Sequence, residues 1–352
     1  MQATTGHRFL RLAYSFGAAA FVATYPAFIE RYLVLTNTYR IPVPHLPEAF
    51  RGFRIVHLTD LHYGFLVPLW VIRHVVSRTN RLARDLVACT GDYVHKRNAT
   101  SQIDRVWPLL SELTAPFGVF SVLGNHDHWA DTARSQEWLT RTGQDLRHKA
   151  ISIEKEGHRL WLAGAGDLWE DHRSLDELLG DVPDSDCRIV LAHNPDTADT
   201  RFSARVDLIL SGHTHGGQVE LPLVGTPLLP VRNREYSSGL KVSPRGSRVF
   251  ISKGIGWAVF PVRFNCVPEI AVLELVPESA GEETTRTWNG GPTRRPGARL
   301  VTTSKPVPLG GSDETRVSDC GYPERLLSRR EHGAERKHGS ERKGKGLARG
   351  IP

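Results

Sequence analysis

From Phe53 to about Val276, short apolar runs alternate with amphipathic segments, and this alternation constrains the fold more than any other feature of the chain. Short apolar runs are typical of buried strands, and amphipathic segments between them are typical of helices that cover a sheet. The alternation predicts an α/β domain. The expected strands are Arg54–Leu58, Leu86–Thr90, Val119–Leu123, Leu160–Ala163, Arg188–Ala192, Leu208–Leu210, Val249–Ser252 and Ile270–Leu275, and the expected helices cover about 67–82, 102–113, 131–141, 174–180 and 195–202.

Side chains that can bind metals follow directly after several of these strands. In α/β sheets, ligands bind beyond the carboxyl ends of the strands. Aspartate, histidine and asparagine are N/O ligands that suit Mn, Fe, Zn or Co, and a bridging carboxylate can hold two such ions about 3.5–4 Å apart. Glycines beside them let the backbone turn sharply. The strand ends carry Asp60-Leu61-His62, Gly91-Asp92, Gly124-Asn125-His126-Asp127, His193-Asn194 and Gly212-His213-Thr214-His215.

In this order, the blocks resemble the calcineurin-like metallophosphoesterase superfamily over about residues 53–276. Two later segments, Pro261-Val262-Arg263-Phe264 and Pro268-Glu269-Ile270, resemble a bacterial membrane-associated branch that includes UDP-2,3-diacylglucosamine pyrophosphatase-like enzymes. The resemblance implies a four-layer αββα sandwich. It also implies hydrolysis of a phosphate ester or pyrophosphate by a hydroxide that bridges two divalent metal ions, with Mn the first candidate and Fe, Zn or Co the others.

The resemblance implies a role for each residue of the blocks. Asp92 would bridge the two ions, and His126 would stand over the leaving oxygen, oriented by Asp127. Asn125 and His126 would also contact the substrate, and Arg263 is a candidate clamp because a guanidinium matches phosphate geometry. The first metal would be held by Asp60, His62, Asp92 and His215, and the second by Asp92, Asn125, His193 and His213.

The amino-terminal segment 1–31 contains an uncharged, mainly apolar run over residues 12–29. The run is just long enough to span a bilayer, so residues 9–31 are predicted to associate with a membrane as an anchor or an interfacial helix. A cleaved export signal and a buried amphipathic helix are the alternatives. Residues 32–52, which contain three prolines, are interpreted as a linker. The predicted location is the bacterial cell membrane, with the side left open.

The segment 277–352 is predicted to be a disordered, low-complexity basic tail because it is poor in clustered apolar residues. It holds 15 Lys/Arg and 10 Asp/Glu, a net +5 of the chain's +7, so the body is near neutral. A near-neutral body disfavours a nucleic-acid partner. Four scattered cysteines without a Cys-x-x-Cys indicate neither a disulfide framework nor a thiolate zinc site.

The expected partner is a phosphate-containing small molecule or lipid, with UDP-2,3-diacylglucosamine the leading example. The sequence leaves two other functions open, a phosphodiesterase of nucleotides or nucleic acid and a non-catalytic metal-binding interaction module. The oligomeric state is also left open.

Overall fold

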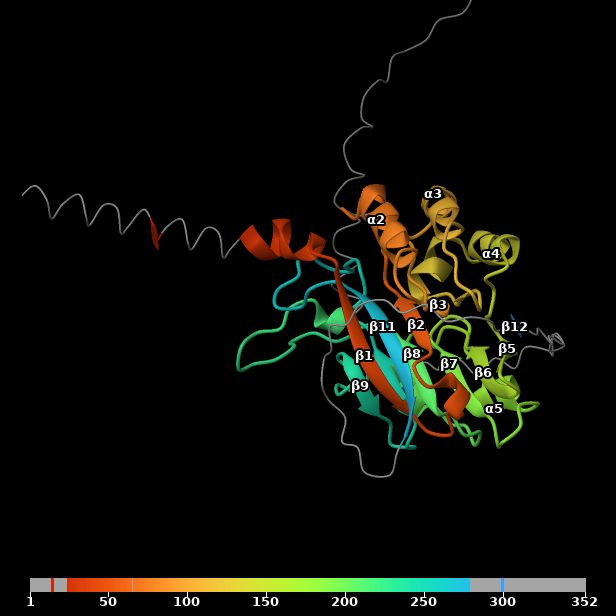
Figure 1. Cartoon of the computed structure of the whole chain (residues 1–352). Coiled ribbons are helices and arrows are strands. Elements are labelled where there is room, and N and C mark those ends of the chain that lie inside the picture. Colours follow the sequence, from red (N-terminus) through yellow and green to blue (C-terminus); the bar gives the residue numbers. More distant parts are fainter. Residues whose placement is uncertain (1–13, 16–23, 65, 279–298, 301–352) are drawn as a thin grey trace, which may run out of the picture. The chain divides into compact units, whose positions relative to one another are not determined.

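A computed structural model describes residues 14–15, 24–64, 66–278 and 299–300. Two sheets dominate it (Figure 1). The five-stranded sheet has the order β1-β11-β2-β3-β4, and the seven-stranded sheet has the order β12-β5-β6-β7-β8-β10-β9. The strands are β1 (Leu35–Val43), β2 (Arg54–Leu58), β3 (Leu86–Cys89), β4 (Val119–Ser121), β5 (Lys149–Lys155), β6 (His158–Gly164), β7 (Cys187–Leu191), β8 (Leu208–Ser211), β9 (Gly239–Val242), β10 (Arg248–Ile251), β11 (Glu269–Pro277) and β12 (Arg299–Leu300).

The two sheets pack face to face over a shared apolar core. Because side chains alternate along a strand, Ile55 of β2 points into this core while its neighbour Val56 points to the opposite face. The seven-stranded sheet repeats the pattern with Ile189 and Val190 of β7. The strands are thus apolar on both faces, as the near-continuous apolar runs in the sequence require.

Helices cover the outer face of each sheet. The apolar faces of α2, α3 and α4 pack on the five-stranded sheet, for example through Val75 of α2 and Trp107 of α3. The seven-stranded sheet is covered by the short α5 and the 3-10 turn η3, through Leu179 and Ala198. The α/β class is confirmed. The helices are α2 (Leu69–Thr79), α3 (Thr100–Leu110), α4 (Asn125–Thr142) and α5 (Leu175–Leu179), and the 3-10 turns are η1 (Glu30–Tyr32), η2 (Glu48–Phe50), η3 (Pro195–Asp199) and η4 (His215–Gly217).

The interpretation of residues 32–52 as a linker is wrong for its central part. Residues Leu35–Val43 form strand β1, which pairs in parallel with β11 along the edge of the five-stranded sheet. Pro42 is compatible with this strand because an edge strand has one side free of ladder hydrogen bonds. Ile41 and Val43 are buried in the core between the sheets.

We predict that Ile41→Ala lowers the free energy of unfolding by about 2–5 kcal/mol, the cost of deleting a buried isoleucine side chain. Ile41 is 1% exposed. The control is Leu35→Ala on the same strand, where the side chain is 47% exposed and the loss should be far smaller. Urea unfolding of both variants makes the comparison. Equal, small effects would restore the linker interpretation.

The predicted anchor lies mostly outside the described residues, which begin again at residue 24. From there the chain is helical over residues 24–28 and packs on the domain. Glu30 is buried and accepts a hydrogen bond from the backbone N–H of Cys266, and the Arg31 guanidinium donates to the carbonyl of Pro261. Among the described residues, no helix is both long enough and apolar enough to cross a membrane.

The predicted tail also lies outside the described residues, apart from its first two residues and the pair Arg299–Leu300. That pair forms β12, which lies antiparallel to Ile153 and Glu154 of β5. Strand β11 runs to Pro277, so the boundary expected at Val276 falls within one residue of the end of the sheet.

Candidate metal centre

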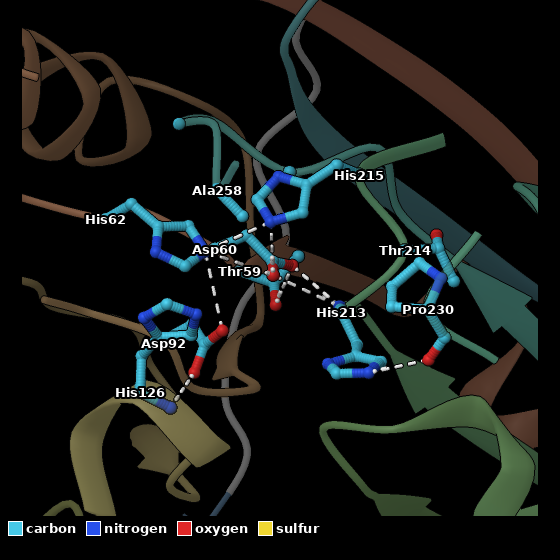
Figure 2. Close-up of polar contacts among 12 residues, drawn as sticks. Thr59, Asp60, His62, Asp92, His126, His213, Thr214, His215, Pro230 and Ala258 are labelled. Carbon is cyan, nitrogen blue, oxygen red and sulfur yellow. Dashed lines mark hydrogen bonds and ion pairs between the residues drawn. The ribbon is translucent and has the colours of Figure 1, made fainter. Parts of the chain in front are cut away.

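The ligand candidates lie where the carboxyl ends of strands from the two sheets meet. Strands β2, β3 and β4 of one sheet are parallel to one another, as are β7 and β8 of the other, so the loops that follow them converge. His213 follows β8 and Asp60 follows β2. The backbone N–H of His213 donates a hydrogen bond to Oδ2 of Asp60, with a distance of 2.9 Å between N and Oδ2 (Figure 2). This bond ties the two sheets together at the site.

Six of the predicted metal ligands fall into two groups of three. Within each group, one potential ligand atom per residue lies within 4.8 Å of the others, and every member is buried. The carboxylate of Asp92 lies between the groups, because its Oδ2 is 3.2 Å from Nε2 of His193 and 3.4 Å from Nε2 of His62. The first group is Asp60, His62 and His215, and the second is Asp92, His193 and His213.

The donor atoms fit a pair of divalent cations. Nε2 of His62 lies 3.0 Å from Nε2 of His215, and Nδ1 of His213 lies 3.1 Å from Nε2 of His193. Such paired imidazole nitrogens suit a shared cation. Asn125 is 2% exposed, and its Oδ1 has no hydrogen-bond partner among the described residues, so this amide oxygen is also open to a ligand.

The backbone at the ligand positions is in an unusual conformation. Asp60, His62, Asp92, His213 and His215 all have positive φ, between 47° and 68°. Only a few per cent of non-glycine residues adopt this left-handed region, with Asp and His among the enriched types. Asp60 and His62 therefore project from a tight loop after β2 and not from extended backbone. Strain of this kind is characteristic of functional sites.

Two glycines allow the loops to approach this closely. A Cβ on Gly91 would lie 2.2 Å from the backbone N of Gly124, and a Cβ on Gly212 would lie 2.2 Å from the Asp60 carboxylate. Contacts this short are sterically forbidden. These positions therefore need glycine because of neighbouring loops, in addition to any turn they make.

Backbone carbonyls orient two of the imidazoles. Nδ1 of His193 lies 2.7 Å from the carbonyl oxygen of Thr90. Figure 2 shows the second contact, in which Nε2 of His213 lies 2.9 Å from the carbonyl oxygen of Pro230. A carbonyl can only accept, so each of these nitrogens carries the proton. The opposite nitrogen then faces the site as a lone-pair donor, the arrangement that metal-binding histidines use.

The electrostatics favour ionised carboxylates and mostly neutral imidazoles. Burial raises the pKa of Asp92, but His193 and His126 outweigh it and hold the pKa well below its usual range. Burial and the neighbouring His193 lower the pKa of His213 to about 3, and burial holds the pKa of His215 well below its usual value. Burial also lowers the pKa of His193, but Asp92 outweighs it and raises the pKa to about 10. A cation at His193 must displace this proton, so metal binding should weaken in acid.

Asp127 does not orient His126, contrary to what the resemblance implied. Its carboxylate accepts hydrogen bonds from the backbone N–H groups of Asp92, Tyr93 and Gly124, at 2.7, 2.9 and 3.0 Å. Neighbouring residues on a helix point about 100° apart, so Asp127 and His126 face different ways from the first turn of α4. Asp127 holds the loop that carries Asp92.

The His126 imidazole is oriented by a backbone carbonyl instead. Its Nδ1 lies 2.7 Å from the carbonyl oxygen of His95 and so carries the proton. Burial lowers the pKa of His126 to about 4, although Asp92 opposes the shift. The neutral ring therefore dominates at pH 7, and Nε2 remains for a substrate.

Arg263 is not placed as a phosphate clamp. It is 0% exposed, and its guanidinium donates to the carbonyl oxygens of Gly256, His215 and Cys266. All three carbonyls belong to loops at the site. Arg263 therefore supports the loop that carries His215, while a clamp would need donors that face the substrate.

We predict that Arg263→Ala lowers the free energy of unfolding by several kcal/mol, at about 1–3 kcal/mol for each buried carbonyl left unpaired. Arg234→Ala is the control, because Arg234 is exposed and also donates to two carbonyls, of Thr226 and Pro227. Thermal unfolding and KM would be measured for both. An unchanged Tm with a raised KM in Arg263→Ala would favour the clamp.

The structure places three further side chains beside the candidate ligands, of which His95 and Trp169 had no predicted role. The His95 ring lies 5.5 Å from the rings of His62 and His126, and these three form another group of potential ligands. Trp129 and Trp169 lie against His126 and His213, with ring centroids 4.7 and 4.6 Å apart. His95 follows Asp92 by three residues and could have been noticed. Trp169 has no local sequence signal of this kind.

Buried carboxylates and imidazoles that converge from the strand ends of two sheets form a candidate metal centre in an α/β fold. The calcineurin-like phosphoesterase family profile matches residues 53–217. The chain is 31% identical to the uncharacterized metallophosphoesterase YkuE of Bacillus subtilis, over 71% of this chain and 88% of the relative. It is 35% identical to the phosphodiesterase YaeI of Escherichia coli (64% and 82% covered) and 26% identical to the UDP-2,3-diacylglucosamine pyrophosphatase LpxG of Chlamydia trachomatis (66% and 88% covered).

The chain belongs to the calcineurin-like phosphoesterase family. It is a metal-dependent phosphohydrolase. Membership leaves the alternative of a non-catalytic interaction module without support.

Proposed function

We propose that the chain hydrolyses a phosphodiester or pyrophosphate with the aid of two divalent cations that share Asp92. The observation that carries this proposal is the position of the Asp92 carboxylate, within 3.4 Å of a histidine from each ligand group. Asp60, His62 and His215 would hold one cation, and His193 and His213 with Asn125 would complete the other.

When bound, two divalent cations supply an activated water and neutralise charge on the phosphoryl group. The residues of the chain would balance the charge of the cations, orient the imidazoles and exclude water. The two carboxylates offset the positive charge, and the carbonyl-bound imidazoles keep their donor nitrogens aimed into the site. The backbone N–H of His126 donates to Oδ1 of Asp92 at 2.9 Å, and the His126 ring lies 4.6 Å from that of His62. Burial excludes bulk water, which strengthens each of these electrostatic interactions.

The test strips the protein with a chelator and then restores Mn²⁺, Zn²⁺, Fe²⁺ or Co²⁺ one equivalent at a time. Hydrolysis of bis(p-nitrophenyl) phosphate should be lost with the metal and return as the second equivalent binds. Full activity after chelation, or full recovery with one equivalent, would contradict a two-cation site.

We further propose that the protein works at a membrane surface, because exposed apolar side chains gather on segments that border the metal centre. Large apolar residues are seldom exposed in such numbers on a soluble monomer without a binding role. They come from the amino-terminal turns, the start of α2 and two loops after β8 and β10 (Figure 1). These residues, the apolar surface, are Phe28, Ile29, Leu33, Leu66, Trp70, Leu221, Leu223, Val224, Leu228, Val259 and Phe260.

Hydrogen bonds and ring contacts connect the segments of the apolar surface. The ring of Tyr32 lies 5.9 Å from that of Trp70, and its hydroxyl donates to the carbonyl of Leu66. The backbone N–H of Arg263 donates to the carbonyl of Pro26, and the Gln218 side chain donates to the carbonyl of Phe260. The loop that carries His215 thus runs directly into this surface.

Vesicle flotation tests this proposal with the full chain. Val259→Asp should weaken binding to phosphatidylcholine vesicles, because Val259 is 59% exposed on the apolar surface and a charge resists burial in lipid. Val242→Asp is the matched control, since Val242 is 55% exposed on β9, outside that surface. Equal binding by the two variants would exclude the apolar surface as the contact.

A lipid-linked nucleotide sugar is the substrate class that joins these two proposals. The Chlamydia trachomatis relative is named for UDP-2,3-diacylglucosamine, whose pyrophosphate would lie at the metals while its acyl chains stay in the membrane. The alternative is a soluble nucleotide or nucleic-acid phosphodiester, in line with the name of the Escherichia coli relative. Comparing hydrolysis of UDP-2,3-diacylglucosamine in micelles with that of UDP-glucose separates them, since only the first should gain from the apolar surface.

A further inference from the structure

Two tryptophans form an aromatic wall beside both ligand groups. Trp129 lies in the first turns of α4, with its ring centroid 4.7 Å from that of His126. Trp169 lies in the loop after β6, with its ring 4.6 Å from that of His213. The two indoles are stacked, 6.4 Å apart with 24° between their planes. The pair therefore extends from the His126 side of the site to the His213 side.

The wall is held in place by its neighbours. Nε1 of Trp129 donates to the Glu170 carboxylate at 2.7 Å, and the Arg97 guanidinium lies 4.1 Å from the Trp129 ring centroid. The backbone N–H groups of Trp169 and Glu170 both donate to Oδ1 of the buried Asp167. One ring of the wall is thus covered by Arg97, while Trp169 is 40% exposed.

A half-exposed indole held next to candidate metal ligands suits a planar ring more than a flexible chain. Flat π-systems stack face to face with tryptophan at little entropic cost, since both partners are rigid. An acyl chain can bury itself on any apolar surface and gains nothing particular from a flat one. Neither tryptophan is needed to hold a metal, so the wall is free to bind the organic part of a substrate.

We propose that Trp129 and Trp169 form a stacking subsite for a nucleobase carried by the substrate, with Trp169 as the contact face. This inference rests on the proposed function, because the phosphoryl group at the metals places the rest of the substrate against the wall. It assigns the substrate to the nucleoside phosphodiesters and nucleoside diphosphates.

Three substrates that differ only at the base test the subsite, namely the methyl 5′-phosphodiesters of uridine, of 5,6-dihydrouridine and of base-free ribose. None has an aromatic leaving group that could itself stack. In the wild-type protein, kcat/KM should be highest for the uridine ester, because the dihydrouridine ring is not planar. Trp169→Ala should lower the uridine-to-ribose ratio of kcat/KM by about 5- to 150-fold, the range for removal of one base-stacking aromatic. Trp169→Phe should keep most of the ratio.

Trp138→Ala is the control, because Trp138 lies further along α4, donates Nε1 to the Asp104 carboxylate and also lies against arginine side chains. It should leave the ratio unchanged. An unchanged uridine-to-ribose ratio of kcat/KM in Trp169→Ala would overturn the subsite. An equal loss in the dihydrouridine-to-ribose ratio would also overturn it, because that loss would indicate a general apolar contact.

Quenching of tryptophan fluorescence by uridine monophosphate gives a readout that does not need turnover. Quenching in the wild-type protein that is lost in Trp169→Ala supports the subsite even if no ester is hydrolysed, in which case the proposed function alone fails. Hydrolysis of all three esters without quenching or a base preference removes the subsite and leaves the proposed function standing.

Discussion

Asp92→Asn should lower turnover more than substitution of any other ligand candidate. The loss should exceed the roughly 10–100-fold that is typical when a residue hydrogen-bonded to a metal ligand is replaced. The reason is geometric. The Asp92 carboxylate reaches histidines of both ligand groups, His62 at 3.4 Å and His193 at 3.2 Å, so removal of its charge weakens both sites together. The amide keeps the size of the side chain, so packing should survive.

Asp60→Asn is the comparison for Asp92→Asn, because Asp60 belongs to one ligand group only. Metal content by mass spectrometry and turnover would be measured for both variants. Asp60→Asn should retain more metal than Asp92→Asn. Two tightly bound ions and near-normal turnover in Asp92→Asn would contradict a bridging role.

His126→Ala should keep its metals and slow hydrolysis of a substrate with a poor leaving group by about 10²–10⁴-fold, the usual contribution of a positioned proton donor. The loss should shrink for a nitrophenyl ester, because nitrophenolate leaves without a proton. Burial lowers the pKa of His126 to about 4, so its protonated fraction rises as the pH falls. The rate ratio of wild type to variant should therefore grow from pH 7 toward pH 5.

The control is His128→Ala, a partly buried histidine two residues further along α4 that contacts Thr132. It should leave both rates close to wild type. Loss of metal from His126→Ala would identify His126 as a ligand, in the group that it forms with His62 and His95. An equal loss on good and poor leaving groups would assign it to phosphate binding.

The sequence was sufficient to predict where the ligand candidates gather, because each lies within a few residues of the end of a strand. Once a strand end is recognised, as after Leu58 or Leu210, the next few residues lie at the edge of the sheet whatever the rest of the chain does. Glycines mark the same positions. The position of a strand end can be predicted from the residues around it, and in the structure every block lies in the segment that follows a strand.

The roles of Asp127 and Arg263 could not be predicted in this way. Asp127 follows His126 in the sequence, but the helix turns its carboxylate toward the backbone of Asp92 and Tyr93. The Arg263 guanidinium is buried because it donates to two carbonyls of its own β10–β11 segment and to that of His215 after β8, a contact that no pattern near Arg263 reveals. The role of Asp127 was mispredicted because a neighbour in sequence was treated as a neighbour in space, and that of Arg263 because only the match between a guanidinium and a phosphate was considered.

Strand β1 was missed for a different reason. Its proline, Pro42, and its partly exposed side chains are typical of a linker, and only pairing with β11, more than 200 residues away, makes it a strand. The Trp129–Trp169 pair is likewise a product of tertiary structure, since α4 and the loop after β6 bring the two rings together.

Crystals of the full-length protein soaked in Mn²⁺ would test the two-cation centre most directly, through anomalous scattering at the manganese edge. We predict two peaks about 3.5–4 Å apart, the usual separation in two-metal sites, one beside Asp60, His62 and His215 and one beside Asp92, His193 and His213. A single peak in a protein that is active under the same conditions, or a peak bound by His62, His95 and His126 in place of one of these, would contradict the account.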